Sequence, residues 1–194
     1  MKKVILITGT PCVGKTTIAK DLSMKLNAQY INLTDYAKTY GLTLEEDTDR
    51  HTTIIDEKAM RNKLGKTIAA SNKSTIIIDG HYAAAVTPTE SVTQVFVLRK
   101  NPIALKQQMI NCGFSTSKID ENLAAEILDS CLVEAIEKQE EDKVCELDIS
   151  GQTTTDIVKV LLDILEKGRE CYSGVVDWLG MLEREGLTDQ YLRI

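Results

Sequence analysis

The segment Gly9 to Thr17 contains the residues of this chain whose types and spacing most directly indicate chemistry. It reads Gly-Thr-Pro-Cys-Val-Gly-Lys-Thr-Thr and fits the phosphate-binding loop pattern G-x-x-x-x-G-K-[ST] at every fixed position. Gly9 and Gly14 allow backbone turns that a side chain would block, so the loop N–H groups can converge on an anion. Lys15 supplies charge for the β- and γ-phosphates, and Thr16 offers a hydroxyl to Mg²⁺. We expect a nucleotide to be bound by Gly9, Cys12, Val13, Gly14, Lys15, Thr16 and Thr17.

The flanking sequence gives this loop the setting that the pattern requires. Val4 to Ile7 is a short apolar run, typical of a buried parallel strand, and Ile18 to Leu26 has apolar residues at helical spacing. A chance match in an unrelated loop would lack both neighbours. The strand, the loop and the helix together predict a phosphate site at a helix N-terminus.

Asp79 and His81 follow a second apolar run, Thr75 to Ile78. A carboxylate at the tip of a buried strand can support Mg²⁺ through water, as a Walker-B aspartate does, or it can cap the next turn. His81 can face the γ-phosphate or position a water, or it can be an ordinary structural or solvated residue. We favour metal support for Asp79 and leave both roles of His81 open. The candidate catalytic residues are Lys15, Asp79 and His81, and the candidate metal ligands are Thr16 and Asp79.

Arg99 ends a third apolar run, Val95 to Leu98, at the same predicted edge of the sheet. It can cap the strand as a surface arginine, or it can stack on a base or bond a phosphate. Asn72 to Thr75 lacks the aspartate of the guanine signature Asn-Lys-x-Asp, which argues against a Ras-type GTPase.

Composition limits the class of protein. The 194 residues suffice for one domain with small insertions, and the formal net charge of −6 argues against a global nucleic-acid footprint. Five scattered cysteines without a C-x-x-C pair argue against a disulfide framework or a zinc site and favour a reducing compartment. We expect a cytoplasmic protein without a signal peptide or a membrane helix, because every apolar run is short.

Strand-like and helical segments alternate along the chain, which predicts an α/β, doubly wound parallel sheet of the P-loop type with its site at the carboxyl ends of the strands. We expect a second strand at Tyr30 to Leu33 and then a helix capped by Thr34. Gly41 to Thr53 should be irregular, and Lys118 to Asp142 should form one long helix. The remaining expected elements are helices at Asp56 to Ser71, from Asn101-Pro102 onward, at Thr153 to Leu165 and at Val175 to Glu185, and a last strand at Cys145 to Ile149.

Several motifs within residues 3–165 resemble one known family. They are the loop at 9–17, Tyr30-Ile31-Asn32 followed by Asp35, Asp56-Glu57, Asp79-x-His81, Val97-Leu98-Arg99, and Gly113-Phe114-x-x-x-Lys118-x-x-Glu121-Asn122-x-x-x-Glu126-Ile127. Together they are similar to the small adenylate kinase-like proteins of archaea and the eukaryotic nucleus, a family linked to maturation of the small ribosomal subunit. Val176 to Leu179 resembles the archaeal branch.

The resemblance implies an enzyme that binds ATP and Mg²⁺ and transfers the γ-phosphoryl group to AMP or to water. It places a monophosphate-binding arm at about 32–55 and a lid at about 112–122 within an adenylate kinase-like domain at 1–170, followed by a C-terminal amphipathic helix and tail at 171–194. Arg99 would lie near the adenine. The implied partners are a small-subunit ribosomal protein and pre-rRNA.

The chain departs from the family pattern where cations are expected. Cys112 and Gln108 stand at positions usually filled by arginine, and Lys38 replaces an arginine of the arm. Loss of an arginine finger can cost about 10³–10⁵ in rate. Lys118, Arg50 and Arg61 could substitute in part.

Cys12 replaces a glycine of the family's loop. It is either an oxidisable thiol with a pKa lowered by the helix N-terminus, or a small inert residue in a tight turn. Two alternatives to the main interpretation remain: a housekeeping nucleoside monophosphate or small-molecule kinase, and a binding module that nucleotide switches.

Overall fold

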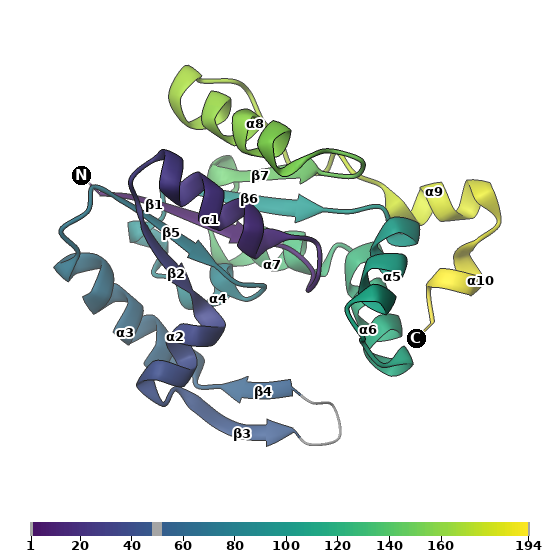
Figure 1. The fold of residues 1–194 in the computed structure, drawn as a ribbon, viewed down its shortest axis with the longest axis horizontal. Helices are drawn as coiled ribbons and strands as arrows, with labels where there is room; N and C mark the ends of the chain where they lie inside the picture. The colour runs from purple at the N-terminus through teal and green to yellow at the C-terminus, as the bar shows by residue number, and fades with distance from the viewer. Residues whose placement is uncertain (1, 48–51, 194) are drawn as a thin grey trace.

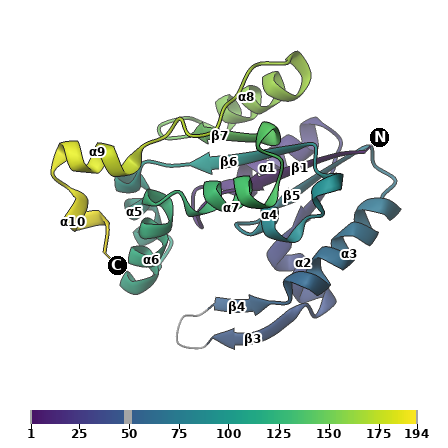
Figure 2. The same ribbon diagram turned by 180° about the vertical axis from the view of Figure 1, so that it is seen from behind.

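One parallel sheet organises the chain. The computed structural model describes residues 2–47 and 52–193. Five strands run in the order β2-β5-β1-β6-β7, with helices on both faces, which confirms the expected doubly wound sheet (Figures 1 and 2). The strands are β1 (Lys3–Thr8), β2 (Gln29–Asn32), β5 (Thr75–Asp79), β6 (Gln94–Arg99) and β7 (Val144–Asp148).

Each face of the sheet has its own core, because successive side chains of a strand point to opposite sides. Ile5 and Ile7 pack with helices α1 (Lys15–Lys25) and α8 (Thr154–Lys167). Val4 and Leu6 pack on the other side of the sheet, against α3 (Glu57–Ala70), α4 (Ala83–Val86) and α7 (Ser130–Lys138). Because both faces are covered, the strands consist of near-continuous apolar runs, which is the pattern that the sequence displayed.

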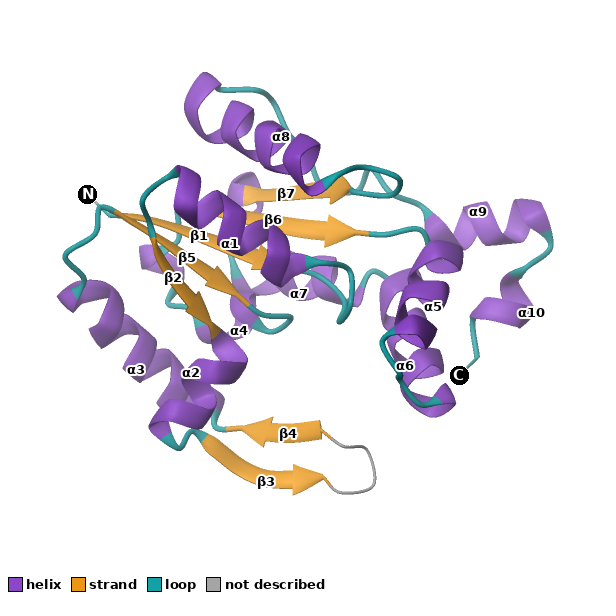
Figure 3. Ribbon diagram, in the orientation of Figure 1, coloured by secondary structure: helices purple, strands orange, loops and turns teal. Residues whose placement is uncertain are grey.

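Two insertions extend from the carboxyl edge of the sheet, on either side of the phosphate loop (Figures 1 and 3). The first contains α2 (Leu33–Tyr40) and a hairpin of β3 (Thr43–Asp47) and β4 (Thr52–Ile55). The second contains α5 (Pro102–Asn111) and α6 (Thr116–Ile127). The residues expected to form the monophosphate arm, about 32–55, lie in the first insertion, and those expected to form the lid, about 112–122, lie in the second. We use arm and lid below only as names for these two insertions.

The expectations for the arm were wrong in two details. Asn32, not Thr34, caps α2, because its side-chain oxygen accepts a hydrogen bond from the backbone N–H of Asp35 at 3.1 Å. Gly41 to Thr53 is not irregular throughout, since the antiparallel β3–β4 pair lies partly within it. The polar residues of this segment show no regular alternation with apolar ones, so its sequence did not indicate a strand.

The predicted long helix at Lys118 to Asp142 is also wrong, because the chain breaks between α6 and α7. Leu128 is the C-cap residue that follows α6, and Asp129 has a left-handed backbone with φ 58°. The Asp129 carboxylate accepts a hydrogen bond from Arg99 at 2.5 Å. This tertiary contact overrides a helical pattern that continues through the break. A short 3₁₀ helix, Glu141–Lys143, follows α7, and another, Thr89–Ser91, precedes β6.

The C-terminal segment packs against the domain. Trp178 and Leu182 of α9 (Trp178–Glu185) and Tyr191 of α10 (Thr188–Tyr191) belong to the same core cluster as α1 and α8. Figure 1 shows α9 and α10 beside α5 and α6, at the end of the molecule opposite the N-terminus. No helix among residues 2–47 and 52–193 is long and apolar enough to cross a membrane.

The scattered cysteines argued against a disulfide framework, but one disulfide joins Cys145 of β7 to Cys171. The backbone N–H of Glu146 donates to the carbonyl oxygen of Tyr172 at 3.0 Å, so residues 171–172 run along the outer edge of β7. This contact brings the two cysteine Cα atoms to 5.4 Å, within the range that a disulfide spans. Two cysteines separated by 26 residues gave no local signal of pairing.

A substitution at Gly9 tests how closely the phosphate loop packs against β6. Its φ is 135°, and an added Cβ would lie 2.3 Å from the carbonyl oxygen of Leu98. We expect Gly9→Ala to lower the free energy of unfolding by about 2 kcal/mol or more, because overpacking and a left-handed backbone act together. Urea denaturation measures this change.

Gly65→Ala is the matched control. Gly65 lies inside α3, and an added Cβ would meet Pro88 Cγ at an ordinary 3.5 Å. This variant should be as stable as the wild type or more stable by up to about 1 kcal/mol, since alanine favours the helix. Equal urea midpoints for Gly9→Ala and the wild type would contradict the packing argument.

Candidate nucleotide site

The phosphate loop has the backbone of an anion-binding turn. Gly9, Cys12 and Gly14 have φ values of 135°, 73° and 112°. Residues with left-handed φ among ordinary ones curve a loop so that its N–H groups share a concave side, where anions bind. Gly14 caps α1 without a side-chain hydrogen bond, so the first N–H groups of α1 are left for a ligand. The backbone therefore fits the phosphates of a nucleotide.

Lys15 is buried under this loop. Its ammonium nitrogen donates to the carbonyl oxygen of Thr10 at 2.9 Å, and its side chain lies on the first turn of α1. Burial lowers the pKa of Lys15, and the nearby Asp79 and Glu126 carboxylates act in the opposite direction. A bound phosphate would also favour the charged ammonium, so the site suits an anionic ligand.

Asp79 is the point where three side chains of the site meet. Its Oδ2 atom accepts hydrogen bonds from Thr16 Oγ1 at 2.7 Å, Tyr30 Oη at 2.8 Å and Asn32 Nδ2 at 3.0 Å. Burial and the contact with Asp79 raise the pKa of Tyr30 to about 12, so the phenol remains a donor at neutral pH. Tyr30 and Asn32 belong to β2, which pairs with β5 in register.

The Thr16 and Asp79 oxygens fit Mg²⁺. They are a hydroxyl and a carboxylate at contact distance, and Mg²⁺ prefers oxygen ligands. In the described part of the chain, no group of three or more His, Cys, Asp or Glu side chains could hold a metal. One protein carboxylate with a hydroxyl, completed by substrate phosphates and water, is the usual Mg²⁺ arrangement in phosphoryl-transfer sites.

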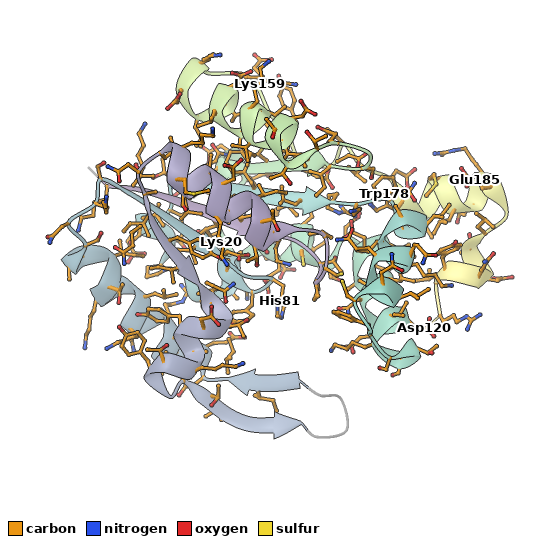
Figure 4. All side chains as sticks on the ribbon, viewed as in Figure 1. Lys20, His81, Asp120, Lys159, Trp178 and Glu185 are labelled. Atoms are coloured by element: carbon orange, nitrogen blue, oxygen red, sulfur yellow. A yellow bond between two sulfur atoms is a disulfide. The ribbon has the colours of Figure 1, made fainter. Side chains whose placement is uncertain are left out.

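His81 follows Asp79 by two residues and lies between the arm and the lid (Figure 4). Its carbonyl oxygen accepts from Thr8 Oγ1 at 3.0 Å, and its ring meets Tyr82 edge to face at 4.8 Å. The ring is exposed to a cavity, yet the surrounding protein, followed by Lys15 and Lys118, lowers the pKa of His81 to about 4. The imidazole is therefore neutral at pH 7.

A cavity of about 1050 Å³ lies beside the phosphate loop. Its size suits a small-molecule ligand. Its walls come from the loop, the arm, the lid and α7, and the lining includes Thr10, Thr34, Lys38, His81, Tyr82, Phe114, Lys118, Asn122 and Cys131. Glu57, Glu121 and Glu134 also line it, and burial together with Glu57 raises the pKa of Glu134. The structure thus brings Lys38, Lys118 and His81 to one hollow beside the phosphate loop.

Arg99 is not at this cavity, and the expectation that it lies near an adenine or a phosphate is wrong. The residue is 1% exposed. Its guanidinium donates to Glu126 Oε1 at 3.0 Å, to the Glu126 carbonyl oxygen at 2.7 Å, to Asp129 Oδ1 at 2.5 Å and to Glu146 Oε1. A buried cation needs such partners, which occupy the N–H edge of the guanidinium, and its burial leaves no exposed face on which a base could stack.

Sequence reasoning missed the role of Glu126. Its Oε2 accepts from Thr10 Oγ1 in the phosphate loop, and its Oε1 accepts from Trp178 Nε1 at 3.1 Å as well as from Arg99. Glu126 is 1% exposed and lies on the buried face of α6. A charged residue at an otherwise apolar helix position was the signal in the sequence that could have indicated a buried ion pair. Sequence gave no way to pair it with Arg99, because the partners lie 27 residues apart.

The remaining candidates have mixed outcomes. Val13 is buried in the core, so its side chain supports the loop, while the Thr16 and Thr17 residues are exposed. Arg61 donates to the carbonyl oxygen of Ala85, and Arg50 lies outside the described residues. The hypothesis of a lowered Cys12 pKa is wrong: burial, followed by Cys112, raises it to about 11.

The chain resembles known proteins in sequence. The family described as an AAA domain matches residues 5–129. The protein named "Putative adenylate kinase" from Thermococcus kodakarensis is 35% identical over 175 residues, which cover 90% of this chain and 92% of that protein. Its namesake from Methanococcus maripaludis is 36% identical over 181 residues, which cover 91% and 95%.

The chain also resembles solved structures. Shikimate kinase from Bacteroides thetaiotaomicron has a TM-score of 0.58 at 18% identity, covering 84% of this chain and 98% of that one. Thymidylate kinase from Candida albicans has a TM-score of 0.55 at 17% identity, covering 87% and 92%. At these identities the likeness shows the α/β P-loop fold alone.

Removing the buried cation tests the Arg99 cluster. We expect Arg99→Met to lower the free energy of unfolding by about 3–5 kcal/mol, because Glu126 and Glu146 remain buried without their partner. Lys167→Met is the matched control, since its ion pair with Asp163 is on the surface. It should leave the urea midpoint essentially unchanged, because solvent and salt screen an exposed ion pair. Similar urea midpoints for the two variants would refute a structural role for the cluster.

Proposed function

The chain belongs to the AAA-domain family and is a relative of the archaeal proteins named "Putative adenylate kinase". We propose that it transfers the γ-phosphoryl group of ATP·Mg²⁺ to AMP and, more slowly, to water. One observation carries the proposal. Thr10 and Pro11 of the phosphate loop and His81 line one cavity together with residues of the arm and the lid. The Thr16–Asp79 pair lies next to it in the chain, because Asp79 precedes His81 by two residues. A donor nucleotide on the loop and an acceptor in the cavity would then meet beside His81.

Different residues of the site bind the phosphates, bind the metal and position the Asp79 carboxylate. The loop backbone and Lys15 hold the donor phosphates and stabilise negative charge on them. Thr16 and Asp79 would hold Mg²⁺, which would neutralise charge on the phosphates. Tyr30 and Asn32 fix the Asp79 carboxylate by donating to it, so that one oxygen keeps its position.

His81 is suited to position rather than to ionise. A neutral imidazole has one N–H donor and one nitrogen acceptor, so it can orient the attacking oxygen of an acceptor or a water. Its pKa of about 4 leaves little imidazolium at pH 7. We assign it a role in the reaction rather than in donor binding.

The site lacks arginines where the family pattern has them, and this favours slow phosphoryl transfer. Cys112 and Gln108 replace expected arginines, and Gln108 accepts a hydrogen bond from Lys100. Lys38 and Lys118 line the cavity, but a lysine lacks the two-pronged fork of an arginine. A metabolic kinase for another small molecule remains the second candidate, because the cavity beside the phosphate loop has the size for a small-molecule acceptor other than AMP. A nucleotide-switched binding module would bind ATP with no turnover.

A coupled assay with purified protein separates these functions. We expect ADP formation from ATP and Mg²⁺ to rise several-fold when AMP is added, and Lys15→Ala to remove at least about 99% of it, since oxyanion-type stabilisation is worth about 10²–10³ in rate. Lys25→Ala, on the exposed far end of the same helix, should match the wild type. ADP formation that AMP does not change would favour the other acceptors. ATP binding without turnover would favour the switch.

The rate as a function of pH tests His81. A folded-state pKa of about 4 means that protonation occurs only as pH falls toward 4, so activity should show no inflection near 6.5. His81→Ala should lower kcat and leave ATP affinity within about twofold, because a positioned oxygen matters only in the reaction. Asp79→Asn should weaken Mg²⁺-dependent binding and turnover together. An inflection near pH 6.5 that disappears in His81→Ala would contradict this assignment.

We further propose that the chain serves assembly of the small ribosomal subunit by binding one of its proteins, with contact to pre-rRNA. The net charge of −6 supports this partner, because ribosomal proteins are basic and opposite charges steer association. The acidic stretch Glu45 to Asp49 is a candidate contact in the arm, and it extends beyond the described residues.

Nucleotide can tune such an interaction only if the partner prefers one nucleotide state. We expect a pull-down from lysate of the source organism to recover a small-subunit protein at low salt, with recovery that changes between ATP and no nucleotide. High salt should weaken it, because the attraction is screened. Recovery of no ribosomal component under any of these conditions would leave the metabolic kinase as the better interpretation.

A further inference from the structure

Two free cysteines from distant parts of the chain touch at the nucleotide site. Cys12 Sγ, in the phosphate loop, lies 3.3 Å from Cys112 Sγ, although 100 residues separate them. Cys112 is the C-cap residue that follows α5, at the start of the turn into α6. We propose that Cys12 and Cys112 form a reversible disulfide that fastens the phosphate loop to the lid and blocks nucleotide binding. The blocking half of this proposal depends on the proposed function, whereas bond formation does not.

The backbone on both sides can accommodate this bond. The sulfurs would need to approach by roughly 1.3 Å, from 3.3 Å to a bond length of about 2.0 Å. Gly113, with φ 76°, follows Cys112 directly, and Gly14 follows Cys12 by two residues. Glycine backbones have the freedom for small adjustments, so the approach does not require repacking of the core.

Cys112 is the thiol that begins the reaction, because it is exposed and Cys12 is half-buried. Burial also raises the pKa of Cys12 to about 11, which makes it a poor first nucleophile. A low-molecular-weight disulfide is the oxidant. The Cys112 thiolate attacks one of its sulfurs, which forms a mixed disulfide and releases one small thiolate.

The second step closes the bond. Cys12, after losing its proton, attacks the Cys112 sulfur of the mixed disulfide and expels the second small thiolate. The two protein thiols lose two protons and two electrons in total. The small disulfide takes up both and leaves as two thiols, so atoms and charge balance. An excess of small thiol reverses both steps.

The bond would act on the part of the loop that meets the phosphates. Cys12 lies between Thr10, whose carbonyl oxygen accepts from Lys15, and Gly14, which caps α1. A disulfide between Cys12 and Cys112 would hold this segment of the loop against the lid. The two sulfur atoms would then lie at the part of the loop that nucleotide phosphates must reach. By linkage, bound nucleotide must in turn oppose formation of the bond.

The other cysteines do not compete. Cys145 and Cys171 are already joined, and Cys131 lies beside the His81 carbonyl oxygen, where burial raises its pKa to about 11. Three thiols are free in the described chain, so closure of the proposed bond should leave one.

The test treats purified protein with oxidised glutathione and follows bond formation by thiol counting and peptide mapping. We expect the free thiols to fall from three to one, a cross-linked peptide pair containing Cys12 and Cys112, and a loss of two hydrogen atoms in mass. Cys131→Ser should still form the bond, whereas Cys112→Ser should not. Saturating ATP·Mg²⁺ should slow formation at least about threefold. A glutathionylated Cys112 without ring closure, or retention of all three thiols, would overturn the proposal.

ATP affinity is then measured by calorimetry on the oxidised protein and again after dithiothreitol. We expect affinity to fall about tenfold or more on oxidation and to return on reduction. Cys112→Ser treated in the same way should show no such cycle, which excludes an effect of the Cys145–Cys171 bond. A mapped bond with unchanged ATP affinity would overturn the blocking role. Reduced protein that binds no ATP would overturn the proposed function, and peptide mapping would still decide whether the bond forms.

Discussion

The buried ion cluster around Arg99 is the constraint on which the arrangement of the site depends. One guanidinium joins the end of β6 to α6, to the residue preceding α7 and to β7 through three carboxylates. Glu126 extends the cluster to the phosphate loop through Thr10, and Glu146 extends it to the C-terminal segment by accepting from the N–H groups of Val175 and Val176. Burying these charges costs desolvation energy, so the cluster is weak evidence for net stability. Its effect is geometric, because few other arrangements would satisfy every group.

The same cluster explains where sequence reasoning failed. Helical periodicity continues from α6 into α7, but Asp129 leaves the helix to reach Arg99. The position of Arg99 at the tip of a strand suggested a contact with a bound nucleotide. Its partners are instead protein carboxylates from distant segments of the chain. Such pairings depend on the assembled fold, as does the bond between Cys145 and Cys171. No local pattern encodes them.

The parts that sequence predicted well are those set by local physics. Apolar runs located the sheet strands, and the loop pattern with its flanks located Lys15, Thr16 and Asp79 as neighbours, now joined by the 2.7 Å contact between Thr16 and Asp79. Asn101 was correctly expected to cap α5, with Pro102 at its first position. The β3–β4 hairpin escaped notice because its polar residues lack the alternation that marks a strand with one buried face.

The loop and the lid are mechanically linked. Glu126 of α6 bonds Thr10, and Cys112 at the end of α5 touches Cys12, so the second insertion contacts the phosphate loop at two of its residues. Thr10 in turn accepts the hydrogen bond from Lys15. A displacement of α5 and α6 must therefore change the loop or break one of these contacts. Since close-packed elements move between discrete arrangements rather than deform continuously, lid position and loop geometry should change together.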